Sequence, residues 1–109
     1  MYYLKKRLEI SAAHKLNLSY GSKCGNLHGH NWIVDIHLKS ETLNADGMVA
    51  DFSRIKGLIH DRLDHGNLND ILPFNPTAEN IAKWIVDTVP HCYRATVIES
   101  ENNEASYEI

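Results

Sequence analysis

Hydrophobic and polar residues alternate along two long stretches of the chain, and the alternation predicts two strands. Over residues 3–14, Leu4, Leu8 and Ile10 share one parity, whereas charged side chains and a serine occupy the other. Residues 28–40 repeat the pattern, with most apolar side chains at even positions. A period of two with one apolar face is typical of a half-buried strand.

Two later stretches have a helical period. Apolar residues recur at intervals of three and four over residues 52–63, where Asp51 or Ser53 is placed to cap the helix. A second amphipathic stretch follows Thr77, a suitable N-cap, and ends before Pro90, which cannot continue a helix. We therefore expect two helices.

The remaining segments complete the element order. Residues 64–76 are polar and contain glycine and proline, so we expect an irregular connection there. Residues 95–99 form a short β-rich run, Asn102 and Asn103 suit a tight turn with positive φ, and residues 106–109 form the return strand. The order β-β-α-α-β-β indicates an α+β fold with a four-stranded antiparallel sheet and both helices on one face.

The first two strands have a preferred register. If position 14 lies opposite 28, the apolar positions of both strands share one face, and a slip of one residue would destroy the match. The same register gathers His14, His28 and His30 at one end of that face. Three neutral imidazoles on rigid strands form the ligand set of a catalytic zinc site, with the fourth position open. A His-x-His pair alone arises often by chance, so the interpretation depends on His14.

Composition limits the class of protein. The chain has 109 residues and a mass of 12.4 kDa, which predicts a single domain over residues 1–109. Its net charge of -3 argues against a nucleic-acid partner. No apolar run approaches the roughly 18 residues of a membrane helix, and the N-terminus lacks a signal-peptide core. We therefore expect a cytoplasmic protein with no membrane partner and, with only two cysteines, no disulfide.

Three further residues have two interpretations each. Cys24, in the polar loop before His28, is either a fourth zinc ligand or a nucleophile or base beside the metal, where a thiol is more available as thiolate. His65, at the end of the first predicted helix, either stabilises the helix C-terminus as a cation or transfers protons. Glu99, in an otherwise apolar strand, either points into solvent or accepts a pair of N–H donors from a guanine-like edge.

Taken together, the motifs resemble those of the 6-pyruvoyltetrahydropterin synthase / 6-carboxytetrahydropterin synthase family. The pattern C-x-x-x-H-G-H, with A-A-H before it and L-D-H-x-x-L-N after it, is a specific combination. The matching segments are in the family's order and cover nearly the whole chain: 11–16, 24–31, 48–52, 63–69, 75–80 and 97–100. The resemblance implies the tunnelling fold, in which trimers close into a barrel and two barrels stack as a homohexamer, with pterin sites between subunits.

The resemblance also assigns roles at the predicted zinc site. It implies that His14, His28 and His30 bind Zn²⁺ and that Cys24 is the catalytic thiol. Glu99 matches the carboxylate that anchors the pterin ring. These assignments make the chain an enzyme with a small-molecule pterin substrate.

A second group of residues completes the implied site. Asp64 and His65 match a proton-relay pair, and Thr77 lies where the family contacts the pterin. Lys15 and Lys23, in or beside the loop of residues 15–27, are candidates to bind a triphosphate, although a role as solvated surface lysines explains them equally well.

The short gap between Cys24 and His28 resembles the carboxy-forming branch of the family. That branch converts 7,8-dihydroneopterin triphosphate to 6-carboxytetrahydropterin, acetaldehyde and triphosphate in queuosine-type (7-deazaguanine) biosynthesis. Asn26 stands where members with an added aldolase-like activity carry glutamate. Two alternatives remain open: the pyruvoyl-forming reaction, and a non-catalytic zinc-stabilised oligomeric module with Cys24 as the fourth ligand.

Overall fold

The computed structural model describes residues 1–109. In chain order the elements are β1 (Tyr2–His14), the 3₁₀ helix η1 (Lys23–Gly25), β2 (His28–Ser40), α1 (Phe52–Leu63), β3 (Gly66–Asn67), α2 (Leu68–Ile71), α3 (Ala78–Thr88), β4 (Cys92–Ser100) and β5 (Asn103–Glu108). The two long strands and the two long helices lie where the hydrophobic periods predict them. Asp51 and Thr77 are the N-caps of α1 and α3.

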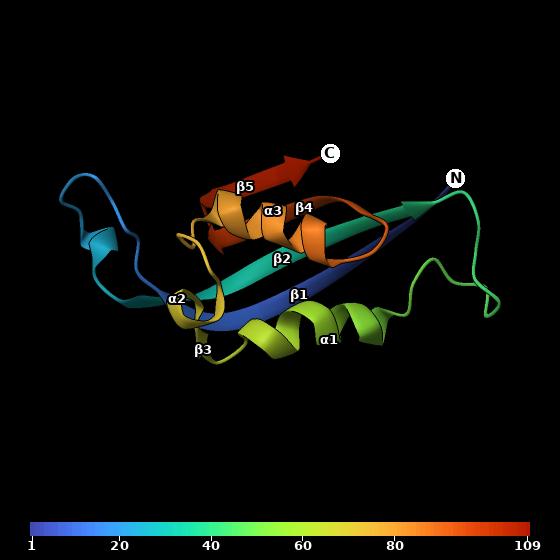
Figure 1. The fold of residues 1–109 in the computed structure, drawn as a ribbon, viewed down its shortest axis with the longest axis horizontal. Coiled ribbons are helices and arrows are strands. Elements are labelled where there is room, and N and C mark those ends of the chain that lie inside the picture. The colour runs from blue at the N-terminus through green and yellow to red at the C-terminus, as the bar shows by residue number, and fades with distance from the viewer.

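One sheet organises the molecule, with the strand order β3-β1-β2-β4-β5. Every pair is antiparallel except β1 with β3. Helices α1 and α3 lie against the same face of this sheet (Figure 1), and their buried side chains join those of the strands in one cluster of 21 hydrophobic residues. The predicted α+β architecture, with both long helices on one face, is confirmed.

The predicted register of β1 and β2 is also confirmed. His14 lies opposite His28, Ala12 opposite His30, and Ile10 opposite Trp32. This pairing places the apolar positions of both strands under the helices, where Ile10 and Trp32 are almost completely buried. A shift by one residue would turn these side chains to the other face of the sheet.

The expected four-stranded sheet and irregular segment 64–76 need a correction. Gly66–Asn67 form a fifth strand parallel to β1, and Leu68–Ile71 form a single helical turn. Both elements are too short to show a hydrophobic period. A Cβ at Gly66 would lie 2.5 Å from Cδ1 of Ile71 and 3.2 Å from the carbonyl oxygen of Leu63, so a larger residue here would force the Ile71 side chain to move.

The C-terminal hairpin also differs from the expectation. Strand β4 begins at Cys92, earlier than the predicted run, and Ser100 pairs with Asn103, so β5 begins inside the predicted turn. The non-glycine residues with positive φ are His65 (60°) and His91 (66°), not Asn102 or Asn103. The register irregularity before Ser100 moves the turn towards the N-terminus and removes the need for positive φ.

The sheet face away from the helices is polar. Arg7 on β1 donates two hydrogen bonds, of 2.7 and 2.8 Å, to the largely buried carboxylate of Asp35 on β2.

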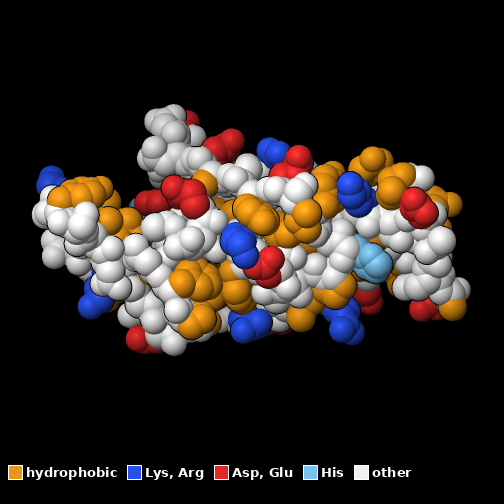
Figure 2. Space-filling model, turned by 45° about the horizontal axis from the view of Figure 1, so that its top comes forward, with side chains coloured by type: hydrophobic (Ala, Val, Ile, Leu, Met, Phe, Trp, Pro, Cys, Tyr) orange, Lys and Arg blue, Asp and Glu red, His pale blue; other side chains and the backbone are white.

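On the side of the molecule seen in Figure 2, acidic and basic side chains alternate with small hydrophobic patches, and no continuous basic surface is visible. No helix combines the length and the apolar character that crossing a bilayer requires.

Candidate metal centre

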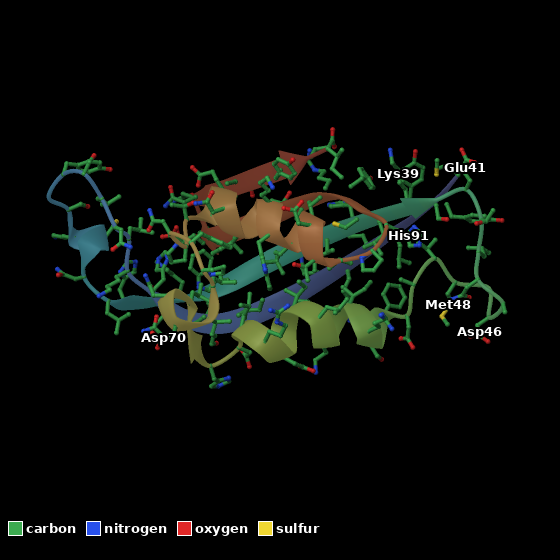
Figure 3. All side chains as sticks on the ribbon, viewed as in Figure 1. Lys39, Glu41, Asp46, Met48, Asp70 and His91 are labelled. Carbon is green, nitrogen blue, oxygen red and sulfur yellow. The ribbon has the colours of Figure 1, made fainter.

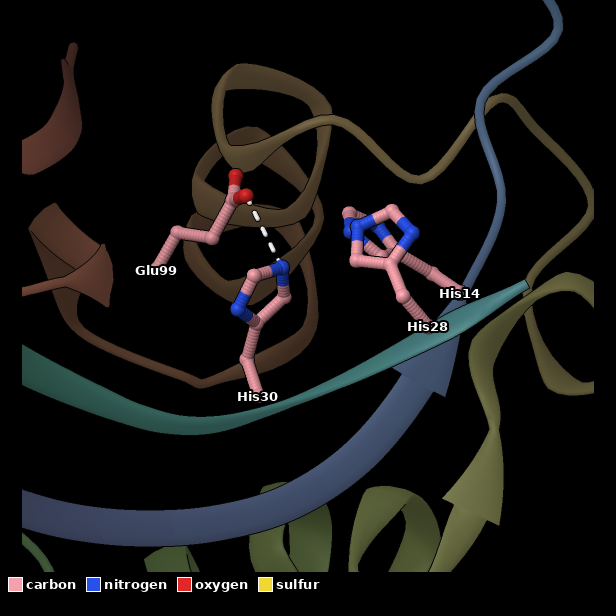
Figure 4. A group of neighbouring side chains, drawn as sticks. All are labelled: His14, His28, His30 and Glu99. Carbon is pink, nitrogen blue, oxygen red and sulfur yellow. Dashed lines mark ion pairs between the residues drawn. The ribbon is translucent and has the colours of Figure 1, made fainter. Parts of the chain in front are cut away.

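Four side chains that can bind a metal meet at one end of the helix-covered face. His14 comes from the end of β1, His28 and His30 from the start of β2, and Glu99 from the end of β4 (Figure 4). One ligand atom from each residue lies within 4.8 Å of the ligand atoms of the other three. We refer to these four residues as the donor cluster.

The strand registers explain how the donor cluster forms. His28 and His30 project from the same face of β2 because successive side chains alternate. On β4, Val97 lies opposite Val34, and the alternation continues so that Glu99 shares a face with Trp32. The sequence alone predicts the histidines but not this position of Glu99, because β2 and β4 are far apart in the chain and no short pattern sets their register.

Backbone carbonyls fix the orientation of two rings. Nδ1 of His14 donates to the carbonyl of Pro76 at 2.8 Å, and Nδ1 of His28 donates to the carbonyl of Asn26 at 2.7 Å. In each neutral ring the lone pair is therefore on Nε2. Such outer contacts are typical of histidines that bind metals.

The environment also favours the neutral form of His14. The side chain is completely buried, and this burial is the main cause that lowers the pKa of His14. The Pro76 carbonyl opposes the shift, and the nearby His28 adds to it. Nε2 of His14 and Nε2 of His30 are buried without a hydrogen-bond partner. Buried polar atoms without partners are rare, so these nitrogens fit metal ligands.

Glu99 is not a solvent-exposed strand end. Its Oε1 lies 3.0 Å from Nε2 of His30, and the two side chains are 26% and 21% exposed. The contact lacks hydrogen-bond geometry, and Glu99 accepts no hydrogen bond from any other residue. The resemblance implies a carboxylate that holds the pterin, whereas the structure places it among the metal-ligating atoms.

Cys24 lies outside the donor cluster. It is exposed in η1, where its N–H bonds to the Ser22 hydroxyl and its carbonyl accepts from Leu16 N–H at 2.8 Å. The thiol is free. In this arrangement the fourth donor beside the histidines is Glu99, not Cys24.

Two asparagine side chains that the sequence analysis did not single out fasten the base of the loop. Asn69 accepts from the N–H of Lys15 and donates to its carbonyl, with 2.8 Å for each bond. Asn75 makes the same pair of bonds with the backbone of Asn17, at 2.9 and 3.2 Å. The density of asparagine is equally typical of a turn, and the more specific signal in the sequence is that Asn69 and Asn75 belong to the matching segments 63–69 and 75–80.

The predicted substrate-binding residues surround this loop. The side chains of Lys15 and Lys23 are exposed, and neither forms an ion pair. Thr77 accepts the N–H of Asn80 as the N-cap of α3, directly after the Pro76 carbonyl that orients His14. Thr77 therefore has a structural role beside the donor cluster.

Asp64 and His65 form a hydrogen-bonded pair on the edge of β1. Asp64 accepts the backbone N–H of Ser11 at 2.9 Å and Nδ1–H of His65 at 2.7 Å. The Ser11 bond is the main cause that lowers the pKa of Asp64, and His65 lowers it further. The same carboxylate oxygen that binds His65 lies 3.6 Å from Nε2 of His60, a neighbour that sequence reasoning missed.

Asp64 and His65 do not belong to the donor cluster of their own chain. The side chain of His65 is 84% exposed and borders a shallow pocket of about 400 Å³. The pocket's other walls include Ser11, Ala13, Gly29 and Asn31, whose positions belong to the sheet face opposite to the one that carries His14. His30 of the donor cluster also lines this pocket. His65 has a positive φ, a backbone conformation that is uncommon among non-glycine residues.

A second pocket of about 410 Å³ lies at the other end of the molecule. Asp46, Met48 and His91, labelled in Figure 3, line it together with the start of α1. None of the predicted site residues is among its walls. The predicted metal ligands therefore lie at the opposite end, where β1 ends and β2 begins.

Comparisons with known proteins find similarity over nearly the whole chain. A family model described as 6-pyruvoyl tetrahydropterin synthase matches residues 3–109. A protein of Synechocystis named 6-carboxy-5,6,7,8-tetrahydropterin synthase is 36% identical over 121 residues, covering 98% of this chain and 93% of its own. A protein of the same name from Bacillus subtilis is 32% identical, covering 97% and 84%. The structure of Caenorhabditis elegans 6-pyruvoyl tetrahydropterin synthase aligns with a TM-score of 0.77 at 27% identity, covering 98% and 94%.

Proposed function

This chain belongs to the 6-pyruvoyl tetrahydropterin synthase family, and we propose that it is a zinc-dependent 6-carboxy-5,6,7,8-tetrahydropterin synthase. The proposed reaction converts 7,8-dihydroneopterin triphosphate and a water molecule from the solvent to 6-carboxytetrahydropterin, acetaldehyde and triphosphate, as a step of queuosine-type biosynthesis in the cytoplasm. The donor cluster is the observation that carries the metal-dependent part of the proposal. The carboxy-forming branch is supported by the names of the Synechocystis and Bacillus subtilis relatives.

His14, His28 and His30 are the proposed protein ligands. Their rings lie with centroids 4.6 to 5.2 Å apart, and neutral imidazole is the form that binds metal. A bound zinc ion would supply Lewis acidity towards the side-chain oxygens of the substrate. The three-histidine set favours zinc over magnesium or calcium, which prefer oxygen ligands.

Proton transfer is assigned to the residues outside the donor cluster. Cys24 would take a proton from the substrate side chain as a thiolate, and His65, oriented by Asp64, would act as the partner acid or base. Since His65 is exposed and lies outside the donor cluster of its own chain, we propose that a neighbouring subunit supplies it. The pterin ring would be held by Glu99 with Thr77, and the triphosphate by Lys15 and Lys23.

Oligomerisation is supported by the sheet edges. The outer edge of β1 is paired only at Ala12 and Ala13 by β3, and β5 is the strand at the other edge. Exposed edges present unpaired backbone groups that can pair with another copy. We propose that three copies pair through these edges into a barrel and that two barrels form a homohexamer.

Product analysis is the experiment that tests the reaction. The zinc-loaded protein is incubated with 7,8-dihydroneopterin triphosphate, and the products are identified by mass spectrometry. Release of acetaldehyde with 6-carboxytetrahydropterin supports the proposal. Formation of 6-pyruvoyltetrahydropterin would instead support the second candidate, which the likeness to the Caenorhabditis elegans enzyme favours. The non-catalytic module is not favoured, because Cys24 lies outside the donor cluster.

A further inference from the structure

The carboxylate of Glu99 occupies a place that a pterin anchor alone does not require. Its Oε1 lies 3.0 Å from Nε2 of His30, within the group of ligand atoms that also includes those of His14 and His28. A residue that only binds the far edge of a ring would not need to share this space with metal ligands.

The chemistry of the contact calls for a cation between the two groups. Glu99 has no hydrogen-bond donor, and Nε2 of His30 has no partner, although both side chains are largely buried. A carboxylate and an imidazole lone pair that face each other repel unless a proton or a metal ion lies between them. In tetrahedral zinc sites, with bonds of about 2.0–2.1 Å, neighbouring ligand atoms lie about 3.3 Å apart. The observed separation is close to that value.

The charge of the donor cluster also suits a divalent ion. Three neutral imidazoles and one carboxylate carry a single negative charge, which partly neutralises a doubly charged metal in a site with little solvent. Removing that carboxylate would leave both positive charges uncompensated by the protein. Cys24, the other residue that the sequence offers as a fourth ligand, is exposed and lies outside the donor cluster.

We propose that Glu99 is the fourth metal ligand of the substrate-free enzyme and leaves the metal to bind the pterin ring. Only the second half of this proposal, in which Glu99 leaves the metal to bind the pterin ring, rests on the proposed function. Two adjacent N–H donors of a pterin engage both oxygens of a carboxylate, so Glu99 cannot bind the ring and the metal fully at once. The exchange frees the fourth position for the substrate at the moment when the ring is held.

The first experiment measures zinc affinity without any pterin. Apo-protein competes with a chromophoric chelator for Zn²⁺, and wild type is compared with Glu99→Gln and Glu104→Gln. Glu104 is an exposed residue of β5 opposite Ile98, so its substitution removes the same charge outside the donor cluster. We expect Glu99→Gln to weaken zinc binding by about tenfold or more, and Glu104→Gln to leave it unchanged. Equal zinc affinities in wild type and Glu99→Gln would overturn the ligand role.

The second experiment adds unsubstituted pterin, which has the ring but no side chain to bind the metal. Pterin binding is followed directly by its fluorescence. If Glu99 exchanges between the two partners, pterin weakens zinc binding in wild type, zinc weakens pterin binding by the same factor, and Glu99→Gln shows no coupling. Pterin that binds without changing zinc affinity overturns the exchange. Pterin that does not bind overturns the exchange and argues against the proposed function, while the zinc comparison still decides the ligand role.

Discussion

The Nδ1–H of His14 donates to the carbonyl of Pro76 over 2.8 Å, and this bond joins the end of β1 to the residue before the N-cap of α3. It fixes which ring nitrogen faces the donor cluster. It also makes the metal centre depend on the docking of α3, because Pro76 lies 62 positions after His14 and directly before the N-cap of that helix. The site is therefore a product of tertiary packing as well as of the strand pattern.

The first prediction concerns the three histidines. His28→Ala removes one ligand from the donor cluster, and we expect zinc affinity to fall by more than about tenfold, since even the loss of an outer contact costs 10–100-fold. Metal content after dialysis against a weak chelator measures the change. His37→Ala, on the same strand but outside the cluster, is the control. Full zinc retention and normal activity in His28→Ala would contradict the assignment.

The second prediction separates the thiol from the metal ligands. Because Cys24 is exposed and lies outside the donor cluster, Cys24→Ala should keep its zinc and its oligomeric state while turnover is lost. Zinc analysis and product formation are measured on the same preparation. Cys92→Ala, at a buried cysteine far along the chain, controls for the general effect of removing a thiol. Loss of zinc in Cys24→Ala would show that the thiol is a ligand.

How much of this site the sequence predicts depends on the type of contact. The pairing of His14 with His28 follows from hydrophobic parity along two strands of 13 residues each, a pattern long enough to exclude a slip. Gly66 and Asn67 pair with β1 through a two-residue strand, which has no period to detect. The bonds of Asn69 to Lys15 join segments 54 positions apart, and no local pattern encodes them.

The place of Glu99 illustrates a different limit. Its side-chain direction follows from the β2–β4 register, and these two strands are separated by a long connection that includes α1 and α3, so alternation along one strand does not set that register. A resemblance to a family supplies a role for the residue but not its distance from His30. The structure adds that distance, and with it the second role proposed for the carboxylate.

A third prediction concerns stability and pH. Hydrogen bonds from Arg7 are the main cause that lowers the pKa of Asp35 below its ordinary 3.8, against the effect of burial. A lowered carboxyl pKa stabilises the fold above the unfolded-state value, and the contribution is lost as the pH falls through the folded-state value. Arg7→Ala should therefore lower the free energy of unfolding near neutral pH, by a modest amount because solvent partly screens the exposed guanidinium.

Urea denaturation at fixed protein concentration, at neutral and at strongly acidic pH, measures this difference. We expect the gap between wild type and Arg7→Ala to shrink at the acidic pH, where Asp35 is protonated in both proteins. Lys56→Ala, whose partner Asp61 is exposed, is the control and should cost little at either pH. A gap that does not change with pH would show that Arg7 acts through packing and not through the carboxylate.

A fourth prediction concerns substrate binding by Glu99. At zinc concentrations that saturate both proteins, Glu99→Gln should lower kcat/KM by roughly ten- to a hundredfold, because a charge-assisted hydrogen bond contributes about 1.5–3 kcal/mol. The amide also presents a donor where the pterin needs an acceptor. Steady-state kinetics with excess Zn²⁺ measure the effect, with Glu104→Gln as the control. Wild-type kinetics in Glu99→Gln would rule out the anchor role.

The last prediction tests whether each active site is shared between subunits. His65 is exposed and lies outside the donor cluster of its own chain, so we expect a neighbouring subunit to bring its relay pair to the metal centre. Cys24→Ala and His65→Ala should therefore each be inactive, while oligomers assembled from an equal mixture of the two regain activity. If the subunits mix at random, about a quarter of the sites would combine an intact Cys24 with an intact His65 from the neighbour. A mixture of Cys24→Ala with His28→Ala should gain nothing, because both residues belong to the same half of the site. Recovery in neither mixture would place Cys24 and His65 in the same subunit's site, and light scattering must show oligomers for the test to apply.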